Sequence, residues 1–281
     1  MSKERKSRRR ISFVICLLIS LFLSVLLASV VLVSTIFNSK YMLYQADRSQ
    51  YAIYLRDDIQ EDLSSGVMSG FDESFYETAI TEGMVSEDLN QEIMRIYNPQ
   101  TPAFDFDTFK SRLYNMFLSE LIEIEGENIS DESKEALLYL ADVSTTIYRD
   151  NIQLWLSNAI VPLLSKGKSI CVTAIVVSSA LLAFSVFTLL RINRSKRDRL
   201  RHMIYSLSAS FVTLAVPTLI IILSGKLKTI GISNKGLYNT IVNYTNGTLY
   251  IILLCCAILI AGVAIMAQMF HNSGHKISRW D

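Results

Sequence analysis

Four long stretches without a charged side chain constrain this sequence more than any other feature. They cover residues 11–37, 169–190, 203–225 and 248–270. Each has at least the ~20 residues that an α-helix needs to cross the ~30 Å hydrocarbon core of a bilayer. One such stretch could be a buried core helix, but four of them predict four transmembrane helices. The mean hydropathy of +0.32 agrees with this class of protein.

Charged side chains are strongly segregated along the chain. Six basic residues lie within positions 1–10 and six more within positions 191–202, whereas residues 40–150 hold 23 acidic and only eight basic side chains, a formal net charge of −15. Cytoplasmic flanks of membrane helices carry the excess of Lys and Arg. The pattern therefore predicts a cell-membrane protein with both termini in the cytoplasm and the acidic segment outside it.

The predicted fold class is an all-α membrane protein with an all-α extracytoplasmic bundle inserted between spans 1 and 2. The first stretch is longer than the ~7–15 apolar residues of a cleaved signal peptide, so we expect an uncleaved signal anchor. The predicted segments are a cytoplasmic basic tail (1–10), the first span (11–37), the extracytoplasmic helical domain (38–168), the second span (169–190), a basic cytoplasmic loop (191–202), the third span (203–225), an extracytoplasmic loop (226–247), the fourth span (248–270) and a cytoplasmic tail (271–281).

Apolar residues recur at helical spacing throughout the predicted extracytoplasmic domain, which favours amphipathic helices over strands. We expect the first helix to continue out of the first span and the last helix to run on into the second span as two stalks. The predicted buried stripes are Tyr44, Tyr51, Leu55, Ile59 and Leu63; Val85, Leu89, Ile93 and Ile96; Phe109, Leu113, Phe117 and Leu121; and Leu137, Ala141, Tyr148, Ile152, Trp155 and Ala159.

Polar residues mark the ends of these helices. Asp72, Ser86, Asp105 and Ser130 stand where a side chain can accept from a free backbone N–H of the first turn. Asn98, which is followed by a proline, is expected to end the helix that begins near Ser86.

Acidic residues form one candidate site. Asp57, Asp58, Glu61 and Asp62 make two carboxylate pairs at i,i+4 spacing on the first helix of the domain. Like charges at this spacing destabilise a helix slightly, and a divalent cation could relieve the repulsion. The alternative is a solvated acidic face that keeps the domain soluble.

Aromatic residues form a second candidate site. Tyr41, Tyr44, Phe71 and Tyr97 could make a docking groove for a peptide or protein partner. The alternative is that they belong to the core of the bundle, where aromatic residues at helical spacing usually lie.

The basic segment 191–202 is a third candidate. In a soluble protein such a run would indicate nucleic-acid binding, but here it joins two spans in a loop too short to fold by itself, so we expect no nucleic-acid partner. We expect it to attract anionic lipid headgroups or an acidic cytoplasmic protein. Its basic side chains are Arg191, Arg194, Lys196, Arg197, Arg199 and Arg201.

The predicted spans contain no Asp, Glu, Lys, Arg or His, which argues against a proton-coupled carrier or an intramembrane protease. No nucleophile, base and metal constellation can be assembled elsewhere, so we expect no enzyme and no cofactor. Two pairs of small residues, Ser206/Ser210 and Ala257/Ala261, have the spacing that lets membrane helices approach closely.

Two resemblances bear on function. The stretches YAIYLRDDIQEDL, VSEDLNQEIMRIY and FDFDTFKSRLYNMF resemble a group of uncharacterised four-span membrane proteins of Gram-positive bacteria, a resemblance that implies no activity. The layout alone, one span, a large outside domain and three further spans, resembles the cell-division permease FtsX and the MacB-type mechanotransmitters. That resemblance implies a cytoplasmic ATPase as a partner.

Three hypotheses for function follow. The preferred one is a non-enzymatic protein whose outside domain senses or binds a cell-envelope partner or ligand and transmits a shift to the membrane bundle. The second is a component of an ATPase-coupled permease or mechanotransmitter. The third is a pore built by homo-oligomerisation.

Overall fold

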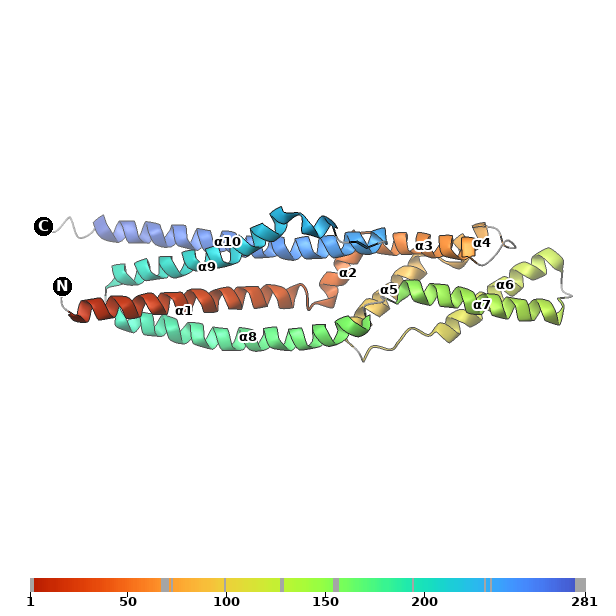
Figure 1. Ribbon diagram of the computed structural model, residues 1–281, viewed down its shortest axis with the longest axis horizontal. Helices are drawn as coiled ribbons and strands as arrows, with labels where there is room; N and C mark the ends of the chain where they lie inside the picture. Colours follow the sequence, from red (N-terminus) through yellow and green to blue (C-terminus); the bar gives the residue numbers. More distant parts are fainter. Residues whose placement is uncertain are drawn as a thin grey trace. The chain divides into compact units, whose positions relative to one another are not determined.

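The computed structural model describes residues 3–66, 71, 73–98, 100–126, 129–153, 157–193, 195–229, 231, 232 and 234–275. Within these ranges the regular elements are ten α-helices and one 3-10 helix, as the sequence predicts for an all-α protein (Figure 1). The chain divides into two compact units. Unit 1 holds residues 1–38, 166–230 and 244–281, and unit 2 holds residues 39–165 and 231–243.

Four helices are long and apolar enough to cross a membrane, which confirms the predicted number of transmembrane helices by length and composition. The helices are α1 (Lys3–Ser34), α8 (Ser157–Ile192), α9 (Lys196–Ser224) and α10 (Lys235–His275). Within them the candidate spans are Arg10–Ser34, Val161–Ile192, Lys196–Ser224 and Lys235–Asn272.

Helices α1 and α9 pack against each other in unit 1 through small side chains. Ser206 and Ser210 are both buried, and the Ser210 hydroxyl donates to the backbone carbonyl of Ser20 at 3.0 Å. Small residues let two backbones come this close, so the predicted role of this pair is confirmed. Ala257 and Ala261 are exposed instead, and among the described residues they form no buried helix contact.

Six helices and the first turns of α10 build unit 2 around one apolar core. Helix α3 packs on α5 and α7, and α6 lies alongside α7 (Figure 1). The helices are α2 (Ser39–Arg48), α3 (Tyr51–Gly66), α4 (Glu73–Ala79), α5 (Glu82–Tyr97), α6 (Phe106–Glu125) and α7 (Asp131–Ile152).

The predicted buried stripes are the core of unit 2. Each stripe residue up to Ile152 is buried except Tyr44, which is 57% exposed, and Leu121, which is partly buried against the core. Trp155 lies outside the described residues. The stripes were recognisable because each helix buries one face and leaves the opposite face polar.

Two predicted N-caps are confirmed. The Asp105 carboxylate accepts from the backbone N–H groups of Asp107 and Thr108, both at 3.1 Å, at the start of α6. The Ser130 hydroxyl accepts from the backbone N–H of Ser133 at 3.0 Å at the start of α7. Asp72 lies outside the described residues.

The predicted N-cap at Ser86 is wrong. Helix α4 ends at Ala79 and α5 already begins at Glu82. Thr81 caps α5, because its hydroxyl accepts from the N–H of Met84 at 3.4 Å. Thr81 has the extended backbone of an N-cap, whereas Ser86 lies inside the helix. The predicted end of this helix is confirmed, because Asn98 is its C-cap.

The predicted continuous stalk from the first span is also wrong. Helix α1 ends at Ser34, and Asn38 closes a turn by donating its N–H to the carbonyl of Thr35 at 3.0 Å before α2 begins. A second break separates α2 from α3, where Gln50 has a φ of 53°. This left-handed conformation is uncommon for a residue other than glycine, and it interrupts the helix between α2 and α3.

The second predicted stalk is interrupted in the same way. Helix α7 ends at Ile152, where Gln153 is the C-cap, and α8 begins at Ser157. The first described side chains of α8, residues 161–165, do not belong to the core cluster of unit 2. The two helices are therefore separate elements.

Two predicted loops are largely helical. The segment 226–247 holds a 3-10 helix at Lys226–Thr229 and the first turns of α10, and the segment 191–202 holds the end of α8 and the start of α9. Residues 235–243 of α10 belong to unit 2, while the remainder of this helix belongs to unit 1. The fourth span is thus the end of a longer helix.

The start of α10 packs closely on α3. Asn234 accepts from the N–H of Leu237 at 2.7 Å with its amide oxygen, and its amide nitrogen donates to the Asp58 carboxylate at 2.6 Å. Gly236 is buried, and a Cβ placed there would lie 2.8 Å from the ring of Tyr51. Only glycine permits this close approach of the two helices.

Candidate ligand-binding site

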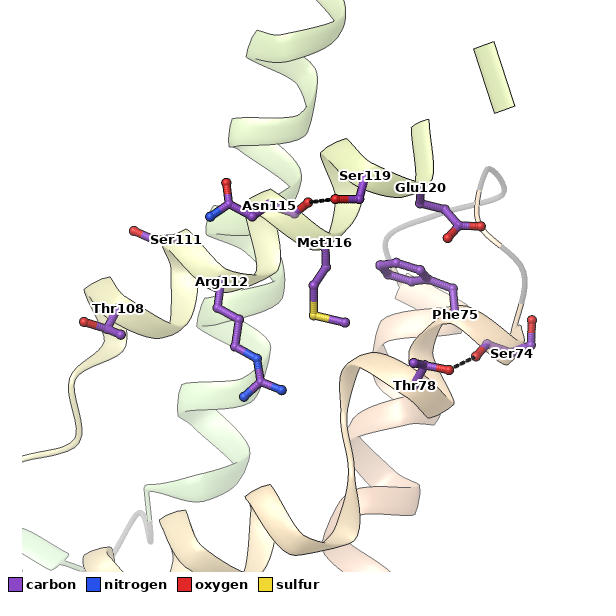
Figure 2. A pocket seen from close by; sticks show the side chains of 10 residues that line it. All are labelled: Ser74, Phe75, Thr78, Thr108, Ser111, Arg112, Asn115, Met116, Ser119 and Glu120. Carbon is purple, nitrogen blue, oxygen red and sulfur yellow. Dashed lines mark hydrogen bonds between the residues drawn. The ribbon is translucent and has the colours of Figure 1, made fainter. Parts of the chain in front are cut away.

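A cavity of about 770 Å³ lies between α4 and α6 of unit 2 (Figure 2). This volume is within the range of pockets that hold small molecules, about 300–1,000 Å³. The lining residues are Ser74, Phe75, Thr78, Thr108, Ser111, Arg112, Asn115, Met116, Ser119 and Glu120.

Helix α6 supplies most of the lining because its core face and its cavity face are neighbours. Phe109, Leu113 and Phe117 are buried in the core at four-residue spacing. Arg112 stands one position before Leu113, and Met116 one position before Phe117. Both therefore lie on the side of α6 next to the core stripe. Figure 2 shows both side chains extending from α6 towards the cavity.

Arg112 is the basic side chain of this cavity. Its guanidinium makes one hydrogen bond, to the Met84 thioether sulfur at 3.3 Å, and it forms no ion pair with any residue that the structure describes. A thioether is a weak acceptor, and an arginine has five N–H donors. Most of the donor capacity of Arg112 is therefore available to a ligand.

A buried acid lies within electrostatic reach of Arg112. Burial raises the pKa of the Asp88 carboxyl above its ordinary value, while the hydrogen bond from the Tyr148 hydroxyl and the Arg112 guanidinium act in the opposite direction. Tyr148 is itself fully buried and stacks on Phe109, with the ring centroids 4.2 Å apart. The positions of Asp88 and Tyr148 are thus held by the core.

Glu120 carries the opposite charge and lies two helical turns further along α6. No hydrogen bond or ion pair joins it to another described residue. Between the two charges, Met116 from α6 and Phe75 from α4 provide apolar contact surface. The cavity therefore offers a cation at one end, an anion at the other and an apolar floor.

A second cavity, of about 500 Å³, lies where α2 and α3 meet α5. Tyr44 lines it together with Asp47, Gln50 and Glu82. Its charged lining residues are acidic, so it lacks the pair of opposite charges found in the cavity between α4 and α6.

The four aromatic residues predicted as a docking groove lie on different elements. Tyr41 and Tyr44 are on α2, and Tyr97 is the last residue of α5 and packs against the core. Phe71 precedes α4 and packs on the Phe117 ring, with the centroids 5.2 Å apart. Phe71 and Tyr97 pack against the core, and Tyr44 lines the second cavity.

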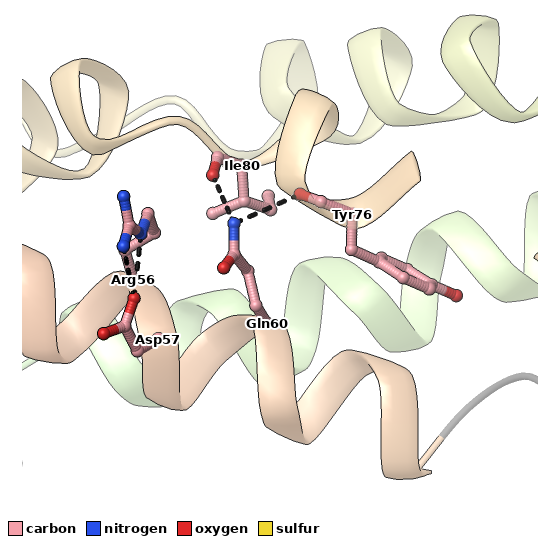
Figure 3. Close-up of polar contacts among 5 residues, drawn as sticks. All are labelled: Arg56, Asp57, Gln60, Tyr76 and Ile80. Atoms are coloured by element: carbon pink, nitrogen blue, oxygen red, sulfur yellow. Dashed lines mark hydrogen bonds and ion pairs between the residues drawn. The ribbon is translucent and has the colours of Figure 1, made fainter. Parts of the chain in front are cut away.

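Three of the four acidic residues predicted as a metal site contact different partners. Asp57 pairs with Arg56 at 2.5 Å, as Figure 3 shows. Asp58 accepts from Asn234, the residue before α10, and Asp62 accepts from Asn151 of α7 at 3.0 Å. Glu61 is exposed.

The middle of α3 also forms a hydrogen bond with the end of α4. Gln60, on the turn that follows Asp57, donates its amide to the Ile80 carbonyl at 2.9 Å at the end of α4 (Figure 3). Burial and the neighbouring carboxylates Asp62, Glu61 and Asp57 raise the pKa of Asp58, against the hydrogen bond from Asn234. Among the described residues, no three His, Cys, Asp or Glu side chains are grouped to hold a metal ion.

The basic side chains of 191–202 make local contacts in unit 1. Arg191 lies over the Phe187 ring, Arg197 over the Phe270 ring and Arg201 over the Tyr205 ring, at 5.5, 4.9 and 5.6 Å to the centroids. Arg199 donates to the backbone carbonyl of Asn193 at 2.5 Å, and Lys196 is exposed. Arg194 lies outside the described residues.

Sequence reasoning missed Arg112 and the combination of its charge with that of Glu120 on one face of α6. One available signal was that Arg112 has no acidic residue three or four positions away, where a helix would pair it, despite the 23 acids of this segment. A second was the Arg112–Met116–Glu120 spacing, which places all three on one face. The contribution of α4 had no local signal, because it depends on packing between distant parts of the sequence.

Comparisons with known proteins identify no relative: no family model, no characterised protein and no solved structure matches this chain. The function must therefore be argued from the geometry of the chain itself.

Proposed function

We propose that this chain is a multi-pass membrane protein that binds a ligand or protein partner through its acidic helical domain on the extracytoplasmic side. The binding signal passes through α10 to the membrane helices, and no catalysis is involved. In this proposal unit 2 is the receiving domain and the cavity between α4 and α6 is its binding site.

The observation that carries the proposal is the continuity of α10. This single helix contributes residues 235–243 to unit 2 and continues as the fourth candidate span. Leu237 packs against the core of unit 2, and Thr240 is fully buried. A shift in α3 would therefore move a helix that continues into the membrane, whereas the breaks at 35–38 and 49–50 can absorb movement.

The distribution of side chains supports the orientation. Large apolar residues of the candidate spans are exposed, among them Phe184 at 68% and Leu223 at 81%, as expected for surfaces that contact lipid. The basic residues of 191–202 favour a cytoplasmic position for that segment, and the net charge of −15 favours an outside position for unit 2.

Transmission through α10 is testable with a spin label near its far end. In a chain whose four cysteines are replaced by serine, Asn272→Cys carries the label and Gly236→Val disturbs the contact between α10 and α3. We expect Gly236→Val to change the mobility of the label, measured by electron paramagnetic resonance in lipid nanodiscs. Adding Asn246→Pro, which interrupts the helix between the two positions, should remove the effect.

The matched control is Gly83→Val. Gly83 is the second residue of α5, as Gly236 is of α10, and a Cβ there would have no heavy atom within 4 Å. If the label at position 272 responds equally to both substitutions, or to neither, transmission through α10 is refuted.

A further inference from the structure

The charges and length of the cavity between α4 and α6 identify a class of ligand. We propose that this cavity binds a short peptide by its free ends, with the peptide carboxylate on Arg112 and the peptide ammonium on Glu120. The inference rests on the proposed function, because it names the ligand class of the same binding site.

The spacing of the two charges sets the length of the peptide. Arg112 and Glu120 are eight residues apart on α6 and lie on one face of the helix. At a rise of 1.5 Å per residue, the Cα atoms of the two residues are about 12 Å apart along the helix axis. An extended chain covers about 3.3–3.6 Å per residue, so three or four residues span the two ends.

Both charged groups are free to bind the peptide ends. Among the described residues, the Arg112 guanidinium donates only to the weak acceptor sulfur of Met84, and Glu120 has no hydrogen-bond or ion-pair partner. A carboxylate can accept two parallel N–H bonds from a guanidinium, which is among the strongest hydrogen-bonded pairs in proteins. An ammonium group pairs in turn with the Glu120 carboxylate.

The charge of the surrounding domain favours a zwitterion over an anion. Residues 40–150 carry a formal net charge of −15, which repels a polyanion such as phosphate before it reaches Arg112. A peptide with both ends free has no net main-chain charge and escapes this repulsion. A single amino acid is also excluded, because its two charged groups lie too close together to reach both Arg112 and Glu120.

Polar side chains of the lining suit a peptide main chain. The Asn115 side chain, which forms no hydrogen bond with a described residue, has both donors and an acceptor for peptide N–H and C=O groups. The Thr78 hydroxyl donates to the Ser74 carbonyl at 3.1 Å and keeps its lone pairs as acceptors. Phe75 and Met116 provide apolar contact for small side chains.

Isothermal titration calorimetry of the full chain in lipid nanodiscs tests the proposal. The probes are tetra-alanine with both ends free, its C-terminal amide and its N-acetyl form. We expect the free peptide to bind about tenfold or more tightly than either blocked form, as the loss of one charge-assisted pair implies. Arg112→Gln should remove the difference between the free peptide and the amide, and Glu120→Gln the difference between the free and acetylated peptides.

Two neighbouring residues on α6 provide matched controls. Lys110→Gln removes a cation that pairs with Asp142 at 2.6 Å and does not line the cavity. Glu123→Gln removes an exposed acid that also does not line the cavity. Both variants should keep the preference for free ends, which separates specific contacts from a general change of charge.

Three results would overturn the proposal. They are no heat from tetra-alanine at millimolar concentration, equal affinity for free and blocked peptides, and tighter binding of inorganic phosphate than of the peptide. None of them bears on transmission through α10, which the spin-label measurement tests without a ligand. Failure of the peptide site and failure of the proposed function are therefore distinguishable.

Discussion

Replacement of Gly236 by valine should detach the start of α10 from α3. A Cβ at this position would lie 2.8 Å from the Tyr51 ring and 2.9 Å from the Tyr54 Cβ, which is closer than carbon atoms approach without a shift. Tyr51 is only 2% exposed, so its ring has little room to move. Overpacking of this kind costs about 1–3 kcal/mol, which corresponds to a change of about 5- to 150-fold in the docking equilibrium.

Hydrogen–deuterium exchange with mass spectrometry measures this change directly. Backbone amides at 238–243 should exchange faster in Gly236→Val by about 5- to 150-fold, because exchange follows local opening. Gly83→Val is the control, since it makes the same substitution at the second residue of a helix and has open space around it. Equal exchange at 238–243 in both variants would show that close packing at Gly236 does not hold α10 to unit 2.

Three further predictions concern the stability of unit 2. Thr81→Ala should lower the free energy of unfolding by about 1 kcal/mol through loss of the α5 cap, whereas Ser86→Ala should change it by less than about half that amount in chemical denaturation. Leu113→Ala, in the core, should cost about 2–5 kcal/mol, and Leu138→Ala, which is 48% exposed, should stay within about 0.5 kcal/mol. Burial raises the pKa of Asp88, so the folded state holds that proton more tightly than the unfolded state does. The resulting stabilisation is fully present below the unfolded-state pKa and is lost as the pH rises through the folded-state pKa. Asp88→Asn should reduce this fall of stability with rising pH, and an unchanged pH slope would contradict the assignment.

The part of the fold that was predictable from the sequence is the part determined by side-chain period. Uncharged stretches identified the four long helices, and the stripes containing Leu55, Val85 and Leu113 identified the buried faces of α3, α5 and α6. Such patterns are local, and burial of one helical face imposes them directly. The caps at Asp105 and Ser130 were predictable for the same reason, because capping needs only the first turn of the helix.

The features that escaped prediction depend on contacts between distant parts of the sequence. The segment KGLYNTIVNY at the start of α10 has a weak helical signal of its own, and Leu237 and Gly236 pack it against α3. Gln50 adopts a left-handed backbone that its residue type does not indicate. The cavity requires α4 to lie beside α6, so Arg112 and Glu120 appear unremarkable until the fold brings Phe75 opposite them.

The most direct test of the central claim is the side of the membrane on which unit 2 lies. In a chain whose native cysteines are replaced by serine, Tyr139→Cys, at a position 72% exposed on α7, and Lys196→Cys, at the exposed start of α9, each provide one reactive thiol. A membrane-impermeant maleimide applied to intact cells should label position 139, and should label position 196 only after the membrane is permeabilised. Labelling of position 196 in intact cells, with position 139 protected, would contradict the proposed orientation and with it the role of unit 2 as an extracytoplasmic receiving domain.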